Sequence, residues 1–398
     1  MTAISISHKI ALEPTKLQAA HFALCVGASR KAYNWALDTW NRQWDDGRKP
    51  KAADIRKLFN EVKWHDDTLR WMTGARNFVA DRSIQNLGEA WKKHFRAPAQ
   101  WRKPTFHSTR IHRSFYVSIG NRKAPNIQVQ GRRVRLCLEG TNYPEGQARI
   151  GWVKMREELR WDGRIESATI SRDEKRWYIS FSCSGAENYP HRAGEGLLGV
   201  AIGFNTVALS NGTVFDQRRP LERYLVKKQR LSRSLSRKQS RLWNKKTKEV
   251  QRQSSANWEK ARARLARLDD RIANLRSDFI HRVTTDIVRT GKALVIEAVN
   301  VQRLLKDGRT ARAASDVSFF EWKRQLQYKT QVAGGSLQQV PTSIDLYQVC
   351  SRCGRRNYDA RKYGKRFVCP HCGLDIENGV NIASNLATVK SAESQACG

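Results

Sequence analysis

The sequence has few acidic residues for its length. Thirty-seven Asp and Glu stand against 73 Lys and Arg, which leaves a formal net charge of +36 and an isoelectric point near 10.4. The cations recur from end to end, whereas a membrane-surface protein usually confines them to a tail or one amphipathic helix. A polyanion relieves self-repulsion on this scale, so the composition predicts a nucleic-acid-binding protein.

Long apolar runs are missing as well. No stretch approaches the roughly 18 residues that a membrane span requires. Residues 1–18 lack the charged start, apolar stretch and cleavage site of a secretory signal. We therefore expect a cytoplasmic or nuclear protein with no membrane partner. The length of 398 residues is enough for two or three domains.

Cysteine is scarce outside one short segment. Cys25, Cys137, Cys183 and Cys397 are scattered, which is typical of a reducing compartment and not of a disulfide framework. The remaining four form two C-x-x-C pairs, each followed by glycine: Cys350 with Cys353, and Cys369 with Cys372. Two facing pairs provide the four thiolates of a tetrahedral structural Zn2+ site, and two matched pairs argue against a redox disulfide. His371 could compete as a ligand, but four thiolates already close the site.

The first half of the chain changes pattern twice. Residues 3–12 alternate as a strand, and residues 13–102 follow helical spacing and are rich in Trp. Residues 103–190 contain short β-type runs separated by Gly, Asn and Asp turns. Regular spacing of this sort predicts a small antiparallel barrel or curled sheet, which the first strand completes, so that the helical segment is an insertion.

The second half follows a linker, AENYPHRAGEG, and begins with the buried-strand pattern LLGVAIGFNTVALSNG at residues 197–212. A helical region follows over roughly 221–289, in which cations outnumber acids so strongly that contact with phosphates is favoured over a merely solvated face. GKALVIEAVN at 291–300 is a further strand, with Glu297 among apolar neighbours. A carboxylate there usually has a partner or a function; alternatively, the strand ends and Glu297 points into a wet cleft.

Taken in order, these segments resemble the TnpB family of transposon-encoded RNA-guided DNA endonucleases, ancestral to the type V CRISPR effectors. SRKAYNWAL is similar to the family's R-x-x-Y/F-N-x-x-L, and LQYKT with the later CSRCG is similar to its L-x-Y-K-A…S-x-x-C-S-x-C-G. The resemblance covers essentially the whole chain, and it implies a cytoplasmic, nucleoid-associated protein of a bacterium. It implies an α+β multidomain protein with four parts: a wedge β-barrel (1–12 and 103–190), an inserted helical recognition lobe (13–102), an RNase-H-like (RuvC) domain (195–345 and 374–398) and a zinc ribbon (346–373).

The family's nuclease centre uses three carboxylates, and only one has a counterpart here. The Asp of G-I-D-L-G corresponds to Ala201, the Glu of I-E-D-L-N to Glu297, and the last Asp of D-R-D-x-N-A-A-x-N to Gly379. Asn381 and Asn385 fix the register of the last motif. Two Mg2+ ions about 3.5–4 Å apart need several anionic ligands, so we expect no catalytic Mg2+ and no nuclease activity.

The resemblance thus implies a nuclease-dead member, of the type known as TnpB-like nuclease-dead repressors. Such a protein binds a guide RNA with a transposon-derived scaffold, reads a short motif beside its double-stranded DNA target, and blocks RNA polymerase with an uncut R-loop. Two alternatives stay open. Asp375, Glu377, Asn205 or Asp216 could rebuild the site of a Mg2+-dependent endonuclease, or the chain could be a guide-independent DNA-binding accessory of transposition.

Ten residues in two segments are the candidates for contact with nucleic acid. They share a basic, aromatic or amide side chain in a basic stretch, which suits phosphates and base faces. The first four lie in SRKAYNWAL and the others in the basic helical region: Arg30, Lys31, Tyr33, Asn34, Lys227, Lys228, Arg230, Arg233, Arg237 and Lys238. A monomer is compatible with the sequence.

Overall fold

The computed structural model describes residues 5–109, 112–121, 124–140, 150–160, 163–174, 176–184, 193–238, 240–244, 249–253, 255–342, 344–360 and 364–396. Cys397 and most of the predicted linker lie outside these residues. The chain divides into two compact units, Met1–Asn188 and Tyr189–Gly398. Among the described residues, no helix has both the length and the apolar character that crossing a membrane requires.

A seven-stranded antiparallel sheet is the frame of the first unit. Its strands are β1 (Ser5–Glu13), β2 (Ser114–Ser118), β5 (Ile127–Gln130), β6 (Arg133–Leu136), β7 (Trp152–Met155), β8 (Arg164–Arg172) and β9 (Trp177–Ser184). Their order is β2-β8-β9-β1-β7-β6-β5, so the first strand of the chain lies in the middle of a curled sheet built from much later residues. A short hairpin of β3 (Gly120–Asn121) and β4 (Ala124–Pro125) stands beside it.

The helices of the first unit are inserted between β1 and β2. They are α1 (Lys16–Asp45), α2 (Ala52–His65), α3 (Asp67–Arg70), the 3-10 helix η1 (Trp71–Gly74) and α4 (Asn77–Arg96). A capping box starts α1, in which the Thr15 hydroxyl accepts from the Gln18 amide and the Gln18 side chain accepts from the Thr15 amide. Phe22 of α1, Leu87 of α4 and Phe181 of β9 belong to one hydrophobic core, so helices and sheet stabilise each other.

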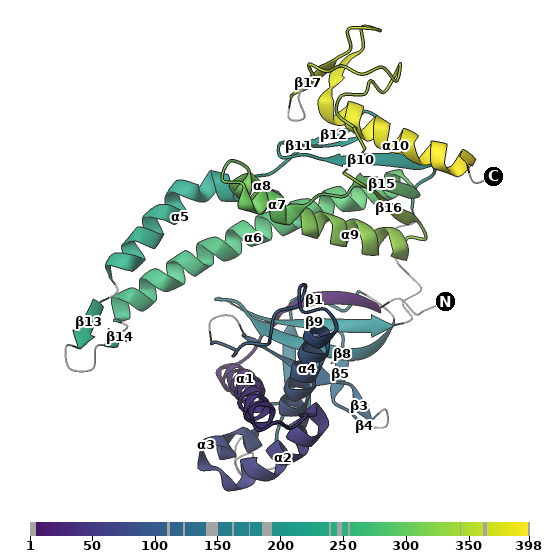
Figure 1. The fold of residues 1–398 in the computed structure, drawn as a ribbon. Helices are drawn as coiled ribbons and strands as arrows, with labels where there is room; N and C mark the ends of the chain where they lie inside the picture. Colours follow the sequence, from purple (N-terminus) through teal and green to yellow (C-terminus); the bar gives the residue numbers. More distant parts are fainter. Residues whose placement is uncertain are drawn as a thin grey trace. The chain divides into compact units, whose positions relative to one another are not determined.

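A five-stranded mixed sheet organises the second unit (Figure 1). The strands are β10 (Leu197–Ile202), β11 (Thr206–Leu209), β12 (Val214–Asp216), β15 (Ala293–Glu297) and β16 (Ser336–Val340), in the order β12-β11-β10-β15-β16. β10, β15 and β16 are parallel, and β10, β11 and β12 form an antiparallel meander. This is the predicted RNase-H-like architecture, and with the curled sheet and inserted helices it confirms the expected α+β multidomain fold.

Helices cover both faces of this sheet. α6 (Ala256–Thr290) and α9 (Phe319–Val332) pack on one face, where Val200, Ile296 and Trp322 share a core, and the short helices α7 (Val301–Lys306) and α8 (Ala311–Val317) precede α9. α10 (Asn378–Ala396) covers the other face, where Leu386 packs on Val295. Figure 1 shows α10 and the pair α6 and α9 on opposite sides of β10.

The predicted continuous helical region over 221–289 is wrong in its middle. α5 (Pro220–Arg237) ends there, and a hairpin of β13 (Ser240–Asn244) and β14 (Glu249–Gln253) precedes α6. Leu242, Trp243 and Val250 are residue types that favour extended backbone, and Asn244 is a turn former. The prediction considered the charge of this segment and overlooked these β formers.

A buried lysine of α9 joins this helix to α6. The Lys329 ammonium of α9 donates to the His281 carbonyl (2.6 Å) and to the hydroxyls of Thr284 (2.7 Å) and Thr285 (2.8 Å) of α6. Its side chain is almost fully buried, and burial lowers the pKa of Lys329 to about 8. The three acceptors are neutral, so they hold the amine in place without fully offsetting the loss of water around its charge.

We expect this lysine to make stability depend on pH. Between about 8 and the ~10.4 of an exposed lysine, the unfolded chain binds more protons than the folded one, so this group's contribution to stability rises with pH. Lys329→Met should flatten that rise, measured as unfolding free energies by denaturant titration on either side of pH 8. Lys323→Met, an exposed lysine of the same helix, is the control. Equal slopes in the wild-type and Lys329→Met proteins would contradict the account.

Candidate functional site

The carboxyl ends of two neighbouring parallel strands, β10 and β15, and the first turn of α10 hold the family's three carboxylate positions. The parallel register of β10 and β15 makes Ala201 and Glu297 neighbours, and Ala201 pairs with Ala208 of β11. Partners in a sheet ladder share a face, and this face is the one that α10 covers. A Cβ added to Gly379, at the start of α10, would lie 2.9 Å from the Cβ of Ala208. Ala201, Glu297 and Gly379 therefore lie close together at the carboxyl ends of β10 and β15, a place that we call the sheet edge.

Glycine is required where α10 crosses β10. A Cβ at Gly199 would lie 1.8 Å from the carbonyl oxygen of Ala383, so any other residue there would push the helix away. The helix therefore rests directly on the strand backbone. This close approach carries the first turn of α10, with Gly379, to the sheet edge.

Glu297 lies at the sheet edge and has a hydrogen-bond partner. The Tyr347 hydroxyl donates to Glu297 Oε1 at 2.7 Å, and the side chain is only partly buried. β15 ends at Glu297 and the carboxylate has a hydrogen-bond partner, so each of the two interpretations left open by the sequence is right in part, while a wet cleft beside Glu297 stays a prediction.

Glu377 brings a second carboxylate to the sheet edge. It ends β18 (Asp375–Glu377), and its Oε1 accepts from the Thr206 hydroxyl of β11 at 2.9 Å. A Cβ at Gly379 would lie 3.3 Å from both carboxylate oxygens of Glu377. Glu377 Oε2 is buried and has no hydrogen-bond partner among the described residues. This carboxylate therefore stands beside the position where the family has its last Asp.

Of the other possible replacement ligands, Asp375 is bound elsewhere, whereas Asp216 is the cross-strand partner of Thr206 and shares its face of the sheet. Asp375 forms an ion pair with Arg366 at 2.7 Å on the exposed hairpin of β17 (Arg366–Val368) and β18. Asp216 is an exposed residue of β12, and Asn205 is exposed in the turn after β10. Of the four alternatives raised by the sequence, the structure brings Glu377 to the sheet edge.

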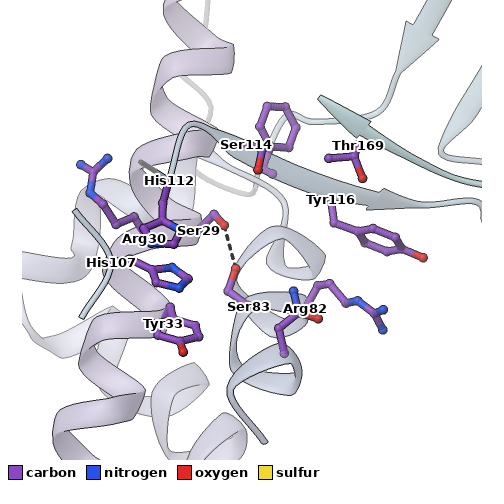
Figure 2. Close-up of a pocket in the computed structure, with 12 residues that line it drawn as sticks. Ser29, Arg30, Tyr33, Arg82, Ser83, His107, His112, Ser114, Tyr116 and Thr169 are labelled. Atoms are coloured by element: carbon purple, nitrogen blue, oxygen red, sulfur yellow. Dashed lines mark hydrogen bonds between the residues drawn. The ribbon is translucent and has the colours of Figure 1, made fainter. Parts of the chain in front are cut away.

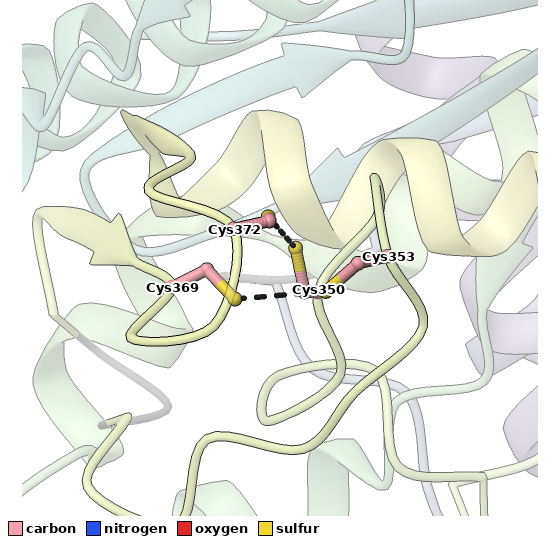
Figure 3. Close-up of side chains that lie close together, drawn as sticks. All are labelled: Cys350, Cys353, Cys369 and Cys372. Carbon is pink, nitrogen blue, oxygen red and sulfur yellow. Dashed lines mark hydrogen bonds between the residues drawn. The ribbon is translucent and has the colours of Figure 1, made fainter.

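The four predicted zinc ligands lie together (Figure 3). The sulfur atoms of Cys350, Cys353, Cys369 and Cys372 are all within 4.8 Å of one another, with Cys350 to Cys372 at 3.6 Å and Cys353 to Cys369 at 3.7 Å. A tetrahedron with Zn–S bonds of about 2.3 Å has sulfur–sulfur edges of about 3.8 Å, so the thiols fit a zinc ion. His371 is exposed and outside this cluster.

Each cysteine pair sits on the same kind of turn. The Gly354 amide donates to the Cys350 carbonyl at 2.9 Å, and the Gly373 amide donates to the Cys369 carbonyl at 3.0 Å. Both glycines have positive φ, +71° and +69°, which explains why glycine follows each pair. The two turns therefore present their thiols to each other in equivalent ways.

Two asparagines of α10 attach this cluster to the sheet unit. Asn381 accepts from the Ser351 amide (2.9 Å) and donates to the Val349 carbonyl (2.8 Å). Asn385 donates to the carbonyls of Val349 (2.8 Å) and Leu346 (3.0 Å). Both side chains are buried. In the sequence, these asparagines served only to fix the register of the last motif. Two amide side chains four residues apart on one helix were the signal that could have predicted this role.

A cavity of about 200 Å³ in the first unit contains two of the predicted nucleic-acid residues, Arg30 and Tyr33 (Figure 2). The rings of Tyr33 and His107 stack at 3.5 Å, and those of His107 and His112 at 3.4 Å. Burial lowers the pKa of His107 to about 4 and also lowers that of His112, so the stack is neutral near pH 7. Arg30 supplies the cation beside it.

Asn34 has a structural role next to this cavity. Its side-chain amide donates to the His107 carbonyl at 3.0 Å and accepts from the His107 backbone amide at 2.7 Å, so it fixes the backbone that carries the His107 ring. Lys31, the remaining candidate of this motif, is exposed.

The six basic candidates of the second unit lie along α5, with Lys238 as its C-cap. Lys228 is committed in part to the fold, because it pairs with Asp269 of α6 at 2.8 Å. The other five are exposed: Lys227, Arg230, Arg233, Arg237 and Lys238. Contact of all ten candidates with nucleic acid stays a prediction.

We predict that metal and fold are coupled at the cysteine cluster. Cys350→Ser or Cys369→Ser should release zinc, because a three-thiolate site loses affinity, and should lower the melting temperature of the second unit. Zinc content by elemental analysis and thermal unfolding check this. Cys137→Ser, a cysteine of the first unit outside the cluster, is the control. Melting that stays unchanged after loss of a cluster thiol would contradict a structural metal.

Three family profiles match separate parts of the chain. The IS605 OrfB profile, described as a probable transposase, matches residues 203–307, and a Cas12f1-like TNB domain matches residues 319–386. A profile described as a helix-turn-helix domain matches residues 1–49. The described part of that segment holds β1 and one continuous helix, α1.

Relatives match over almost the full length. The chain is 28% identical over 409 residues to the putative RNA-guided DNA endonuclease InsQ of Escherichia coli K12, covering 98% of this chain and 93% of InsQ. It is 25% identical over 407 residues to a putative RNA-guided DNA endonuclease of Streptomyces pristinaespiralis, covering 100% of this chain and 92% of that protein. The fold matches the Cas12f1 chain of a Cas12f1–sgRNA–target DNA complex with a TM-score of 0.57 at 11% identity, covering 98% of this chain and 100% of that one.

These relatives correct one expectation. The absence of carboxylates at Ala201 and Gly379 predicted that the chain is not an enzyme, but the proteins it matches end to end are named as endonucleases. The sequence named Glu377 only as an alternative ligand, and the packing of α10 places its carboxylate beside Gly379. The profiles, the relatives and the fold together identify the chain as a member of the TnpB family, the IS605 OrfB proteins.

Proposed function

We propose that this chain binds a guide RNA and pairs it with one strand of a double-stranded DNA target. The observation that carries the proposal is the match, over nearly the whole chain, to relatives named as RNA-guided DNA endonucleases. The net charge of +36 supports it, because both ligands are polyanions. In such a complex base pairing supplies the sequence specificity, while the protein recognises the backbone and a short motif beside the target.

The sheet edge is the proposed nuclease centre. Glu297 and Glu377 are the residues that would hold Mg2+, a cation that prefers carboxylate oxygens. The fit rests on Glu377 Oε2, which is buried without a hydrogen-bond partner among the described residues and so has a free site for a cation. When bound, Mg2+ would stabilise the negative charge that develops on the phosphoryl oxygens.

The hydrogen bonds at the edge orient these two carboxylates. Tyr347 donates to Oε1 of Glu297, and Thr206 donates to Oε1 of Glu377, so both carboxylates are held in place, and Oε2 of Glu377 is the oxygen that would bind the cation. Ala201 leaves no carboxylate between them, so fewer anionic ligands are present than in the family pattern. We therefore expect cleavage that is slow compared with target binding.

Cleavage tests the proposed centre. The protein, purified with its co-expressed RNA, should cut a matched duplex in Mg2+. Glu297→Gln and Glu377→Gln should each slow cutting by about a hundredfold or more, because each removes an anionic ligand while keeping the side-chain shape. Asp375→Asn is the matched control, because Asp375 lies in the same strand as Glu377 but pairs with Arg366.

The outcomes separate the hypotheses. If the protein binds the target with its guide but leaves it uncut, the proposed nuclease centre is contradicted. That result would agree with the expectation from the sequence that no catalytic Mg2+ is bound. Equal binding of DNA with and without RNA would support a guide-independent accessory of transposition instead. Sequencing the co-purified RNA shows whether it carries a transposon-derived scaffold.

Transcriptional repression is a second function that the same R-loop supports. Ala201 and Gly379 favour it, because a poorly liganded centre lets the paired target persist. A persistent R-loop over a promoter excludes RNA polymerase for as long as it lasts.

A reporter assay tests repression by occupancy. With a guide that matches its promoter, the reporter should be silenced by the wild-type protein and equally by Glu297→Gln, because occupancy does not need the carboxylate. A guide of scrambled sequence is the control. Full reporter expression with the matched guide, or equal silencing with the scrambled one, would count against repression.

A further inference from the structure

Four aromatic rings of the first unit form a continuous stack between α1 and α4. Trp40 stacks on Trp91 with ring centroids 5.6 Å apart and planes 8° apart. Trp91 stacks on Phe95 (5.2 Å, 18°), and Phe95 stacks on Trp44 (5.3 Å, 21°). The pairs come from positions four residues apart on each helix, which places them on one face. We call this set the aromatic ladder.

The ladder runs from the core to the surface. Trp40 and Trp91 are buried, whereas Trp44 is 50% and Phe95 48% exposed. Folding therefore leaves two large rings partly in water at the end of an ordered stack. Burying an aromatic ring removes a large apolar area from water, so an exposed pair of this kind indicates a binding surface.

The chain that follows α4 extends this surface with more rings and cations. Trp101 is 50% exposed and lies under the Lys93 ammonium, which is 5.2 Å from the ring centroid. Residues 91–106 contain five cations and no Asp or Glu: Lys92, Lys93, Arg96, Arg102 and Lys103. All five are exposed. Aromatic faces are thus combined with a strongly positive neighbourhood.

We propose that the exposed end of the aromatic ladder, Trp44 and Phe95, binds unpaired bases of single-stranded RNA by stacking. The cations of residues 91–106 would contact the phosphates of the same strand. The proposal rests on the RNA binding proposed above and names a place for it in the first unit. It goes beyond that function, because pairing of guide and target requires no stacking of protein rings on bases.

The surface chemistry favours RNA over a protein partner. Lysine is depleted in protein interfaces, whereas three of the five cations of residues 91–106 are lysines and the segment has no acid; Glu89, just before it, pairs with Lys92. Ring planes already aligned within 21° of each other continue a stack to which a flat base can be added without reorganisation. Inside a duplex each base is stacked on its neighbours and its faces are not accessible to a protein ring, so the ligand must be single-stranded.

Binding of an abasic oligonucleotide separates stacking from charge attraction. The full-length protein, freed of RNA, is titrated with a short labelled uridine oligonucleotide and with an abasic strand of equal length. Trp44→Leu should weaken binding of the uridine strand about fivefold or more and leave the abasic strand unaffected. Trp44→Phe, which keeps a ring, should retain most of the affinity.

The controls distinguish a loss of base stacking from a loss of folding and from a failure of guide function. Trp152→Leu changes a partly exposed tryptophan of β7 outside the ladder and should alter neither affinity. Melting curves should show that the Trp44 variants stay folded and melt within a few degrees of the wild type, because half of the Trp44 side chain is already exposed and only its stacking on Phe95 is lost. Unchanged uridine affinity in Trp44→Leu, or an equal loss with the abasic strand, would overturn the proposal. The assay uses no guide scaffold and no target, so failure of cleavage or repression leaves its result intact.

Discussion

The direct contact of α10 with β10 determines the arrangement of the second unit. Gly199 has no side chain, so the carbonyl of Ala383 can approach the strand backbone. This contact places Gly379 over β11 and brings Glu377 against Thr206. One turn further, Asn381 and Asn385 bind the backbone that leads into the first cysteine pair. The position of a single helix thus connects the carboxylates of the sheet edge to the cluster of four cysteines.

Much of this arrangement could be predicted from local patterns. The spacing of Cys350, Cys353, Cys369 and Cys372 specifies a four-thiolate cluster, because few other structures need two such pairs, and the structure brings the sulfurs together. The strand with Glu297 and the insertion of helices after β1 were also predicted correctly. The β13 and β14 hairpin was missed, because the charge of the segment was weighed above its β formers.

Other features depend on contacts between distant residues and leave little trace in a single sequence. Glu377 could be named as a possible ligand, but its approach to Thr206, 171 positions earlier, follows from the packing of α10. The amide pairing of Asn34 with His107 joins residues 73 positions apart. The aromatic ladder likewise requires that α1 and α4 lie side by side with their rings in register. Residue types indicated these possibilities, and tertiary packing selected among them.

We propose that the sheet edge still binds a hard cation, although two carboxylates of the family pattern are absent. An anomalous difference map of the protein with guide RNA and target DNA, crystallised with Mn2+ in place of Mg2+, tests it most directly. The account predicts a peak within coordination distance of both Glu297 and Glu377. An ordered sheet edge with no peak there, in crystals that bind Mn2+ elsewhere, would contradict it.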